Sequence, residues 1–297
     1  MDHPAAGLVQ SLVIKAQRRL LDDVGRKAGT PMVYLKAAWA DPVLYGGQGQ
    51  RVGSDIDVLV RPATFFACAR ELEALGFRRY VLPWMRATFR WGYKAWTYEG
   101  LPRWMTVDLH RGIAEPPWFD LPADACVDRA IAYDSIDGPI LSLDPEDQVL
   151  YAAAHYGNHR FSIDQRHLGD IERLLAIRTI DWAAVTARAR PLGLAVPLAL
   201  VQESLHARGA AVPAPAAADS PPSLRWRLAY AHRWVATAPQ LERRLPLSRF
   251  LDNAVRMPLL SGRAAALPRF AAGYVGLRAL DLAAEVAARV GARVGRG

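Results

Sequence analysis

The chain has 297 residues, of which 52% are apolar and 22% are charged, and its formal net charge is +8. This length suits one large or two ordinary domains, and the apolar share excludes an intrinsically disordered chain. No apolar run reaches the roughly 18 residues that a membrane span needs, and no signal peptide is recognisable. The two cysteines, Cys68 and Cys126, suit neither a metal motif nor a disulfide framework. We therefore expect a cytoplasmic protein without a membrane span.

The first half of the chain predicts one helix followed by a mixed sheet. Residues 1–28 have the pattern of an amphipathic helix, and residues 30–140 alternate short apolar runs with turns. A helix over 62–75, ending at Gly76, interrupts the strands. The strands are expected near residues 32–36, 56–60, 77–82, 88–98 and 104–110.

The second half predicts helices. Asp144 and Pro145 form a helix start, with Asp144 as the N-cap and proline at the first helical position. Helical periodicity continues to residue 212. The fold class is therefore α+β, a mixed-sheet domain followed by a helical C-terminal region. The expected divisions are a sheet domain over 1–140, a helical domain over 141–212, a Pro/Ala linker over 213–222 and an Arg-rich helical tail over 223–297.

Two carboxylates lie at the start of one expected strand, where residues 53–60 read Gly-Ser-Asp-Ile-Asp-Val-Leu-Val. Because side chains alternate along a strand, Asp55 and Asp57 point to one face while Ile56 and Val58 point into a core. Carboxylates about 7 Å apart on one face repel each other, and they are costly to keep ionised without a cation.

A third carboxylate lies inside a later apolar strand, where residues 105–110 read Met-Thr-Val-Asp-Leu-His. Alternation puts Asp108 on the face opposite Val107 and Leu109. A lone buried carboxylate is energetically expensive, so it needs a reason. If the two strands are neighbours, three carboxylates converge in a site for a hard divalent cation.

Two alternatives apply to Asp55 and Asp57 alone. They could be solvated turn residues at the boundary between a loop and a strand. A calcium loop is excluded, because the chain runs directly into an apolar strand without further oxygen ligands. The apolar strand and the third acid together favour the metal site.

These motifs resemble the nucleotidyltransferase superfamily with its DNA polymerase beta-like fold. More narrowly, the chain resembles the bacterial family of uncharacterised nucleotidyltransferases over roughly residues 30–205. The shared motifs are a strand ending in Leu-Lys, an Arg before Ser-Asp-Ile-Asp, a Val-Asp-Leu-His strand, and a His-x-x-x-His element followed by an Asp. The chain departs from the family at Ala37, where a glycine follows Lys36 in the family. The resemblance implies a nucleotidyltransferase-type mixed-sheet domain with a helical region after it.

The resemblance also implies roles for the three acids. Asp55, Asp57 and Asp108 would be catalytic and would hold two Mg²⁺ ions, which Mn²⁺ could replace. The ions would bind a nucleoside triphosphate (NTP) as cosubstrate and activate an attacking hydroxyl, whose proton Asp108 could accept. Gly53 and Ser54 would contact the nucleotide, although the glycines of this chain lie nearer the acids than in the superfamily.

Two cationic side chains are placed to bind a triphosphate. Lys36 ends the apolar strand expected near 32–36, and its alternative role is that of a surface lysine at a strand end. Arg51 follows a Gly-rich loop, residues 46–50, and its fork geometry suits phosphate. The glycines let backbone N–H groups approach a phosphate, or they form a flexible surface loop.

The histidines suggest either substrate contacts or structural roles. His155 and His159 share one helical face, and their spacing shows no third ligand for zinc. The resemblance implies that His110, His155 and His159 contact substrate or support the site. Asp170 is a candidate for the same role, whereas its spacing from Arg166 favours a surface ion pair.

The C-terminal tail carries all of the excess positive charge. Residues 223–297 contain thirteen arginines and four acids, against a net charge of +8 for the whole chain. Arginines near Trp226 and Trp234 suit contact with RNA or an anionic surface. An ordinary Arg-rich helical surface is the alternative.

Three functions are open from the sequence. The first is Mg²⁺-dependent transfer of a nucleoside monophosphate from an NTP to a hydroxyl of a small molecule, a peptide or protein, or RNA. The second is a catalytically inactive nucleotidyltransferase-fold module that binds nucleic acid, and the third is a two-metal phosphotransferase. The presence of all three acids favours an enzyme. A metal site alone does not decide which phosphorus is attacked.

Overall fold

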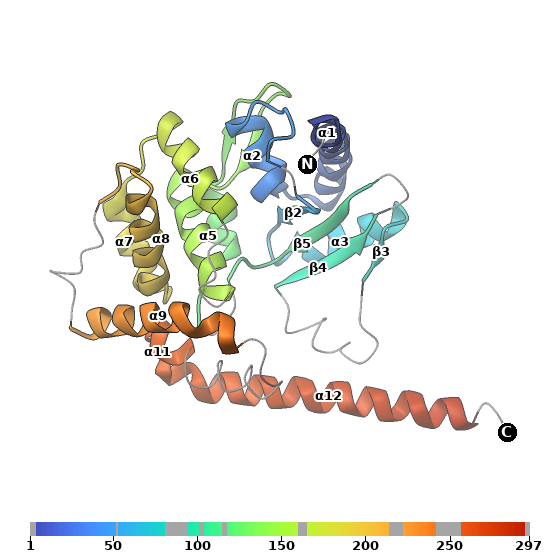
Figure 1. Cartoon of the computed structure of the whole chain (residues 1–297). Coiled ribbons are helices and arrows are strands. Elements are labelled where there is room, and N and C mark those ends of the chain that lie inside the picture. The colour runs from blue at the N-terminus through green and yellow to red at the C-terminus, as the bar shows by residue number, and fades with distance from the viewer. Residues whose placement is uncertain are drawn as a thin grey trace.

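The computed structural model describes residues 4–51, 53–80, 94–100, 104–114, 118–159, 165–213, 222–241 and 257–294. A five-stranded mixed sheet lies beside a group of helices, and the C-terminal helices lie below both (Figure 1). The expected α+β class is confirmed.

Strands β2 and β5 are parallel neighbours at the centre of the sheet, and every other pair is antiparallel. The expected strand near 88–98 lies partly outside the described residues, and the observed strand there begins at Ala95. From one edge to the other, the order is β1 (Val33–Tyr34), β2 (Asp55–Leu59), β5 (Thr106–His110), β4 (Ala95–Glu99) and β3 (Arg78–Arg79).

Helices α1 (Pro4–Ala28) and α3 (Phe65–Ala74) pack together, and α3 also packs on β5. Trp96 of β4 lies against Phe65 of α3, with 4.9 Å between the ring centroids. Trp96 is also the neighbour of Leu109 in the sheet, so α3 covers the apolar face. Alternation along β2 and β5 therefore leaves the other face to polar side chains.

The connection between sheet and helices forms a small unit of its own. It contains a short helix and a two-stranded antiparallel sheet, and β7 also packs beside β1. Its elements are α4 (Ala123–Arg129), β6 (Ile131–Tyr133) and β7 (Ile140–Ser142).

The helical half begins where the sequence predicts. The Asp144 side chain accepts a hydrogen bond from the backbone N–H of Asp147 at 2.6 Å, so it caps the first helix. Helix α2 lies on the sheet side and contacts α6. The helices are α2 (Lys36–Leu44), α5 (Pro145–Asn158), α6 (Gln165–Ile177), α7 (Trp182–Ala189) and α8 (Ala195–Ala207).

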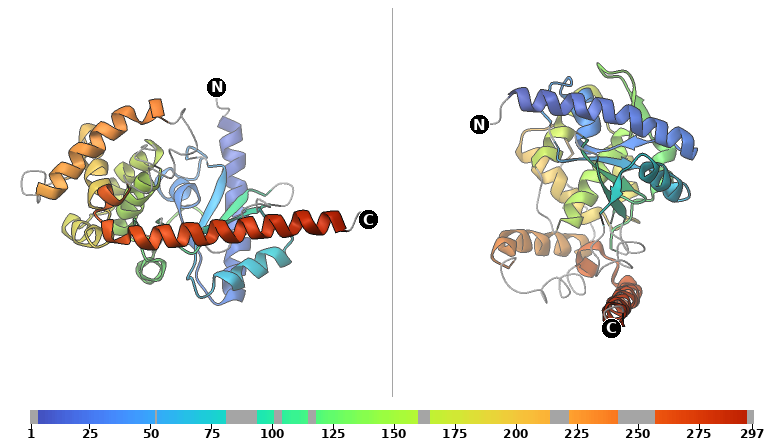
Figure 2. Two further views of the ribbon diagram at one scale, coloured as in Figure 1. Left: turned by 90° about the horizontal axis from the view of Figure 1, so that it is seen from below. Right: turned by 90° about the vertical axis from the view of Figure 1, so that its right-hand side faces the viewer.

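The tail is helical in its described parts, while residues 214–221 of the expected linker lie outside them. The final helix is the longest and projects past the other elements (Figure 2). None of the helices in the described ranges is long and apolar enough to cross a membrane. The tail elements are α9 (Pro222–Leu241), α11 (Met257–Ser261), a 3₁₀ turn (Ala264–Ala266) and α12 (Leu267–Val294).

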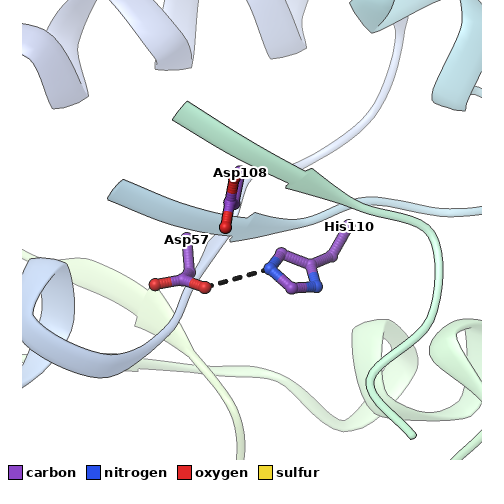
Figure 3. A group of neighbouring side chains, drawn as sticks. All are labelled: Asp57, Asp108 and His110. Atoms are coloured by element: carbon purple, nitrogen blue, oxygen red, sulfur yellow. Dashed lines mark hydrogen bonds and ion pairs between the residues drawn. The ribbon is translucent and has the colours of Figure 1, made fainter. Parts of the chain in front are cut away.

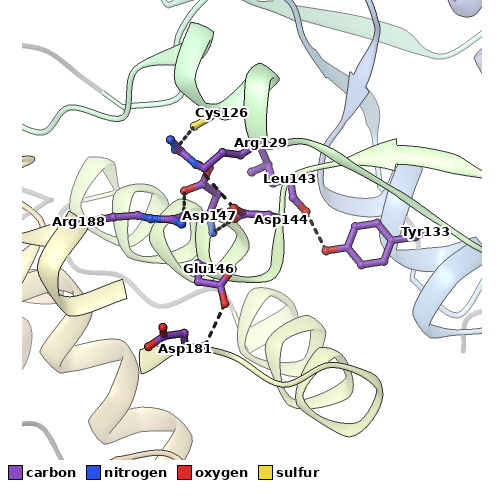
Figure 4. A network of polar contacts seen from close by, with 9 residues as sticks. All are labelled: Cys126, Arg129, Tyr133, Leu143, Asp144, Glu146, Asp147, Asp181 and Arg188. Atoms are coloured by element: carbon purple, nitrogen blue, oxygen red, sulfur yellow. Dashed lines mark hydrogen bonds and ion pairs between the residues drawn. The ribbon is translucent and has the colours of Figure 1, made fainter. Parts of the chain in front are cut away.

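A polar network joins the small connecting unit to the helical half (Figure 4). The fully buried Asp147 carboxylate of α5 binds Arg129 of α4 at 2.7 Å and Arg188 of α7 at 3.1 Å. Burial raises the pKa of Asp147, and the hydrogen bond and charge of Arg129 oppose that shift. Asp144 shares Arg188 at 3.2 Å. Ion pairs with Arg129 and Arg188 therefore hold the first turn of α5 against α4 and α7.

We expect Asp147→Ala to lower the free energy of unfolding by about 3 kcal/mol, because it removes the buried partner of two arginines. Urea unfolding followed by circular dichroism measures the change. The control is Asp128→Ala, because Asp128 is exposed and pairs with Arg61 at the surface. That control should change the free energy of unfolding by less than about 1 kcal/mol. Equal effects of the two variants would contradict a structural role for the network.

Candidate active site

Three carboxylates lie on the polar face of the two central strands. In the register of β2 and β5, Asp57 is paired with Asp108 and Asp55 with Thr106. Figure 3 shows Asp57 and Asp108 side by side, with His110 turned towards Asp57. Single ligand atoms of Asp57, Asp108 and His110 all lie within 4.8 Å of one another. The neighbouring strands therefore bring Asp57 and Asp108 together with His110, while Asp55 lies two residues before Asp57 on β2 and outside this group.

Asp57 is the most buried of the three acids, with 1% of its surface exposed. Its Oδ1 atom accepts hydrogen bonds from Lys36 Nζ at 2.6 Å and from His110 Nε2 at 3.0 Å. Burial alone would raise the pKa of Asp57, but the His110 hydrogen bond and the Lys36 charge hold it well below its usual range. Its Oδ2 atom is buried and has no partner among the described residues. One oxygen is thus held by the protein, and the other is left for a ligand.

The other two acids are less buried and have lighter support. Asp55 accepts a hydrogen bond from the Ser54 hydroxyl at 3.2 Å. Burial and the charge of Asp57 raise the pKa of Asp55. Asp108 Oδ1 accepts a hydrogen bond from Thr97 Oγ1 at 2.6 Å, across the pair of strands β5 and β4. Asp55 and Asp108 each have a carboxylate oxygen that could bind a further ligand.

This donor set fits a hard divalent cation. Mg²⁺ and Mn²⁺ prefer carboxylate oxygens, and the three acids supply them from one face. The orphaned Oδ2 of Asp57 is the sharpest indication, because a buried carboxylate oxygen without a donor is costly unless a cation contacts it. Asp55, Asp57 and Asp108 are the residues that could hold such an ion.

Lys36 reaches this site from the turn between β1 and α2. It is the first residue of α2, and its φ of 47° is the only left-handed value of a non-glycine residue among those described. Such a conformation costs free energy and is concentrated at functional sites. Burial alone would lower the pKa of Lys36, but the charge and hydrogen bond of Asp57 raise it. The lysine is therefore cationic beside the acids.

The Gly-rich loop before β2 folds around a carboxylate of the protein. Gly46, Gly47 and Gly49 have φ values of 69°, 69° and 70°, which glycine adopts without strain. The backbone N–H groups of Gly49 and Arg51 bind the two carboxylate oxygens of Asp41 at 3.2 and 3.0 Å. These two amides thus face an internal anion.

Arg51 and Asp170 form a buried ion pair between the loop and α6. Arg51 Nε and Nη2 each lie 2.9 Å from an oxygen of Asp170, and both side chains are about 5% exposed. The Tyr45 hydroxyl donates to the same carboxylate at 3.1 Å. The expected surface position of Asp170 is therefore wrong, because Asp170 is buried against the loop.

Gly53 and Ser54 lie between the loop and the acids. A side chain at Gly53 would meet the Ala37 methyl group at 3.0 Å, so glycine lets the loop pass close to α2. The Gly53 carbonyl accepts a hydrogen bond from Gln10 of α1. Ser54 is exposed next to Asp55.

Histidine rings stack between α5 and α6. The His155 ring lies 4.2 Å from His167 and 4.1 Å from His159, centroid to centroid. Burial and the charges of His167 and His159 lower the pKa of His155 to about 2, so this ring is neutral at pH 7. Tyr151, one turn earlier, is fully buried, and burial together with the charge of Asp57 raises its pKa. The helix face that carries His155 therefore lies near the acids.

Sequence reasoning missed three residues of this region. Thr97 could have been found from alternation, because it occupies the polar face of β4 opposite Asp108. Asp41 binds backbone amides of the loop that follows it, and His167 stacks on His155 of the preceding helix, but no periodicity in the sequence singles out either contact.

Two neighbouring carboxylates on parallel central strands, with a histidine and a lysine beside them, form a group of side chains that could hold a metal ion. The sequence matches the family described as uncharacterised nucleotidyltransferase over residues 7–207. The chain belongs to this nucleotidyltransferase family, as its motifs indicate.

Solved structures that the chain matches include two proteins whose names refer to antibiotics. The lincomycin-bound lincosamide antibiotic adenylyltransferase LnuA has 17% identity and a TM-score of 0.38, over 55% of this chain and 96% of that one. The antibiotic-resistance factor ANT(2'')-Ia has 14% identity and a TM-score of 0.37, over 66% of this chain and 93% of that one. No curated protein sequence matches the chain.

We expect the Arg51–Asp170 pair to couple the loop to α6. A double-mutant cycle with Arg51→Met and Asp170→Asn should give a coupling energy of about 3 kcal/mol in urea unfolding, as for buried pairs. The matched control is the more exposed pair between Glu172, which is also on α6, and Arg208, which follows α8. Its coupling should stay below about 1 kcal/mol. If the coupling energy between Arg51 and Asp170 is no larger than that of the control pair, the buried pair does not join the loop to α6.

Proposed function

We propose that the protein is a metal-dependent nucleotidyltransferase that moves a nucleoside monophosphate from an NTP onto a hydroxyl group. The single observation that carries this proposal is the pairing of Asp57 with Asp108 on parallel strands, beside Asp55 and with a buried, unpartnered oxygen on Asp57. Family membership supports the same reaction class.

The three acids would bind the catalytic cations, with Mg²⁺ as the expected ion and Mn²⁺ as a substitute. Bound divalent cations neutralise the triphosphate and lower the pKa of the attacking hydroxyl. Asp57 would contribute Oδ2, because its Oδ1 is held by Lys36 and His110. Asp108 would hold the hydroxyl in line and accept its proton, through the oxygen that Thr97 does not bind.

The surrounding residues would position substrates rather than react. Lys36 would contact the triphosphate, and Ser54 lies at the exposed edge of the acids where a nucleotide would enter. Arg51 would act through its ion pair with Asp170, which keeps the loop and α6 together. The neutral His155 would contact substrate without adding positive charge beside the metal site, and the exposed His159 lies next to it.

The test measures binding and transfer separately. Calorimetric titration of each of the four ribonucleoside triphosphates with Mg²⁺ should show metal-dependent binding of at least one. NTP labelled at the α-phosphate, supplied with pools of small metabolites, peptides and RNA, should then yield a labelled product. Asp108→Asn should lower product formation at least about a thousandfold, because several kcal/mol of charge stabilisation is lost.

The control variant is Asp124→Asn, because Asp124 is exposed on α4 and belongs to no part of this site. It should leave transfer unchanged. Transfer of the γ-phosphate label instead of the α-phosphate label would assign the protein to the phosphotransferases. Absence of NTP binding, together with RNA binding by the basic tail, would favour the inactive binding module.

A further inference from the structure

Lys36 places a positive charge directly among the metal ligands. Its Nζ atom lies 2.6 Å from Asp57 Oδ1. The side chain keeps 24% of its surface exposed, whereas Asp57 keeps 1%. The Lys36 side chain therefore contacts the buried carboxylate while part of its own surface stays exposed.

The charges of the site explain why a lysine is held there. Three ionised carboxylates on one face repel each other strongly, and a cation is needed to keep Asp57 ionised while buried. Lys36 and His110 both bind Oδ1, which leaves Oδ2 as the oxygen for a metal ion. A divalent cation at Oδ2 would neutralise the same carboxylate. The Lys36 ammonium and the metal ion would therefore compete for the negative charge of Asp57.

We propose that Lys36 is an exchangeable counter-ion: its ammonium group stabilises Asp57 in the metal-free site and moves to the triphosphate when metal and nucleotide bind. This inference rests on the proposed function. A lysine suits the role because its ammonium is a point charge on a flexible four-carbon stem, whereas an arginine fork would be held in one geometry. Family membership does not by itself assign Lys36 this exchange.

The backbone of Lys36 supports the exchange. A left-handed φ of 47° at a residue with a side chain costs free energy, of the order of 1 kcal/mol or more. Leu35, the preceding residue, donates its backbone N–H to the Asp57 carbonyl at 3.0 Å, so the turn is tied to the strand that carries the acids. The root of the lysine side chain is thus fixed beside Asp57, and the four-carbon stem offers rotatable bonds through which the ammonium can change partner.

The exchange predicts that metal and triphosphate bind cooperatively. Metal binding at Asp57 releases the ammonium, and the released ammonium then binds phosphate. By thermodynamic linkage, triphosphate must strengthen metal binding by the same factor. Part of this cooperativity should therefore disappear when the charge of Lys36 is removed.

The experiment compares wild type, Lys36→Met and Lys36→Arg in two assays. The first titrates Mn²⁺ alone and follows the free ion by electron paramagnetic resonance. The second measures binding of inorganic triphosphate with saturating Mg²⁺ by calorimetry. The matched control is Lys27→Met, because Lys27 is a surface lysine far from any acid of the site and pairs only loosely with Glu71 at 3.9 Å. Circular dichroism verifies that each variant folds.

Lys36→Met should bind Mn²⁺ alone at least about tenfold more tightly, because neighbouring charges shift such equilibria by roughly one to three powers of ten. The same variant should bind triphosphate at least about tenfold more weakly. Lys36→Arg should keep the weak metal binding of wild type, and Lys27→Met should match wild type in both assays.

Each other outcome overturns the exchange. Unchanged Mn²⁺ affinity with weaker triphosphate binding would make Lys36 a phosphate ligand only. Tighter Mn²⁺ binding with unchanged triphosphate affinity would make it a fixed counter-ion. If wild type bound neither Mn²⁺ nor triphosphate, the proposed function itself would fail, so the two failures are distinguishable.

Discussion

The ionisation of one buried carboxylate organises the centre of this protein. Asp57 lies in the middle of the sheet with almost no exposed surface, and it stays ionised only because Lys36 and His110 bind one of its oxygens. Those two partners come from the turn before α2 and from the end of β5. The strand order, the strained backbone at Lys36 and the parallel pairing of β2 with β5 together place these partners beside one charge.

A second set of buried charges joins the acid face to the helical half. Asp41 binds two backbone N–H groups of the Gly-rich loop, and the loop then presents Arg51 to Asp170 of α6. These contacts tie the loop before β2 to α6 and so connect the strand that carries Asp55 and Asp57 to the helical half.

Local periodicity predicted the acid face, because alternation depends only on neighbouring residues. The pattern of residues 54–60 and 105–110 places three acids on one face, and the N-cap at Asp144 follows from residue type. The Arg51–Asp170 pair could not be predicted in the same way, because 119 positions separate the two residues. Spacing alone assigned Asp170 to the surface, since a helical period cannot show which face another domain covers.

Arg51 and Lys36 are the two cations near the acids, and their different contacts indicate different functions. Arg51 is a fork with rigid geometry, and it is committed to a buried carboxylate from which removal would cost several kcal/mol. Its role in binding phosphate stays a prediction, and its contacts favour a positioning role. Lys36 is partly exposed and binds Oδ1 of Asp57, whose other oxygen has no partner among the described residues. The residue type at each position therefore matches what that position must do: a fixed fork where the fold is joined, and a mobile point charge where substrate charge arrives.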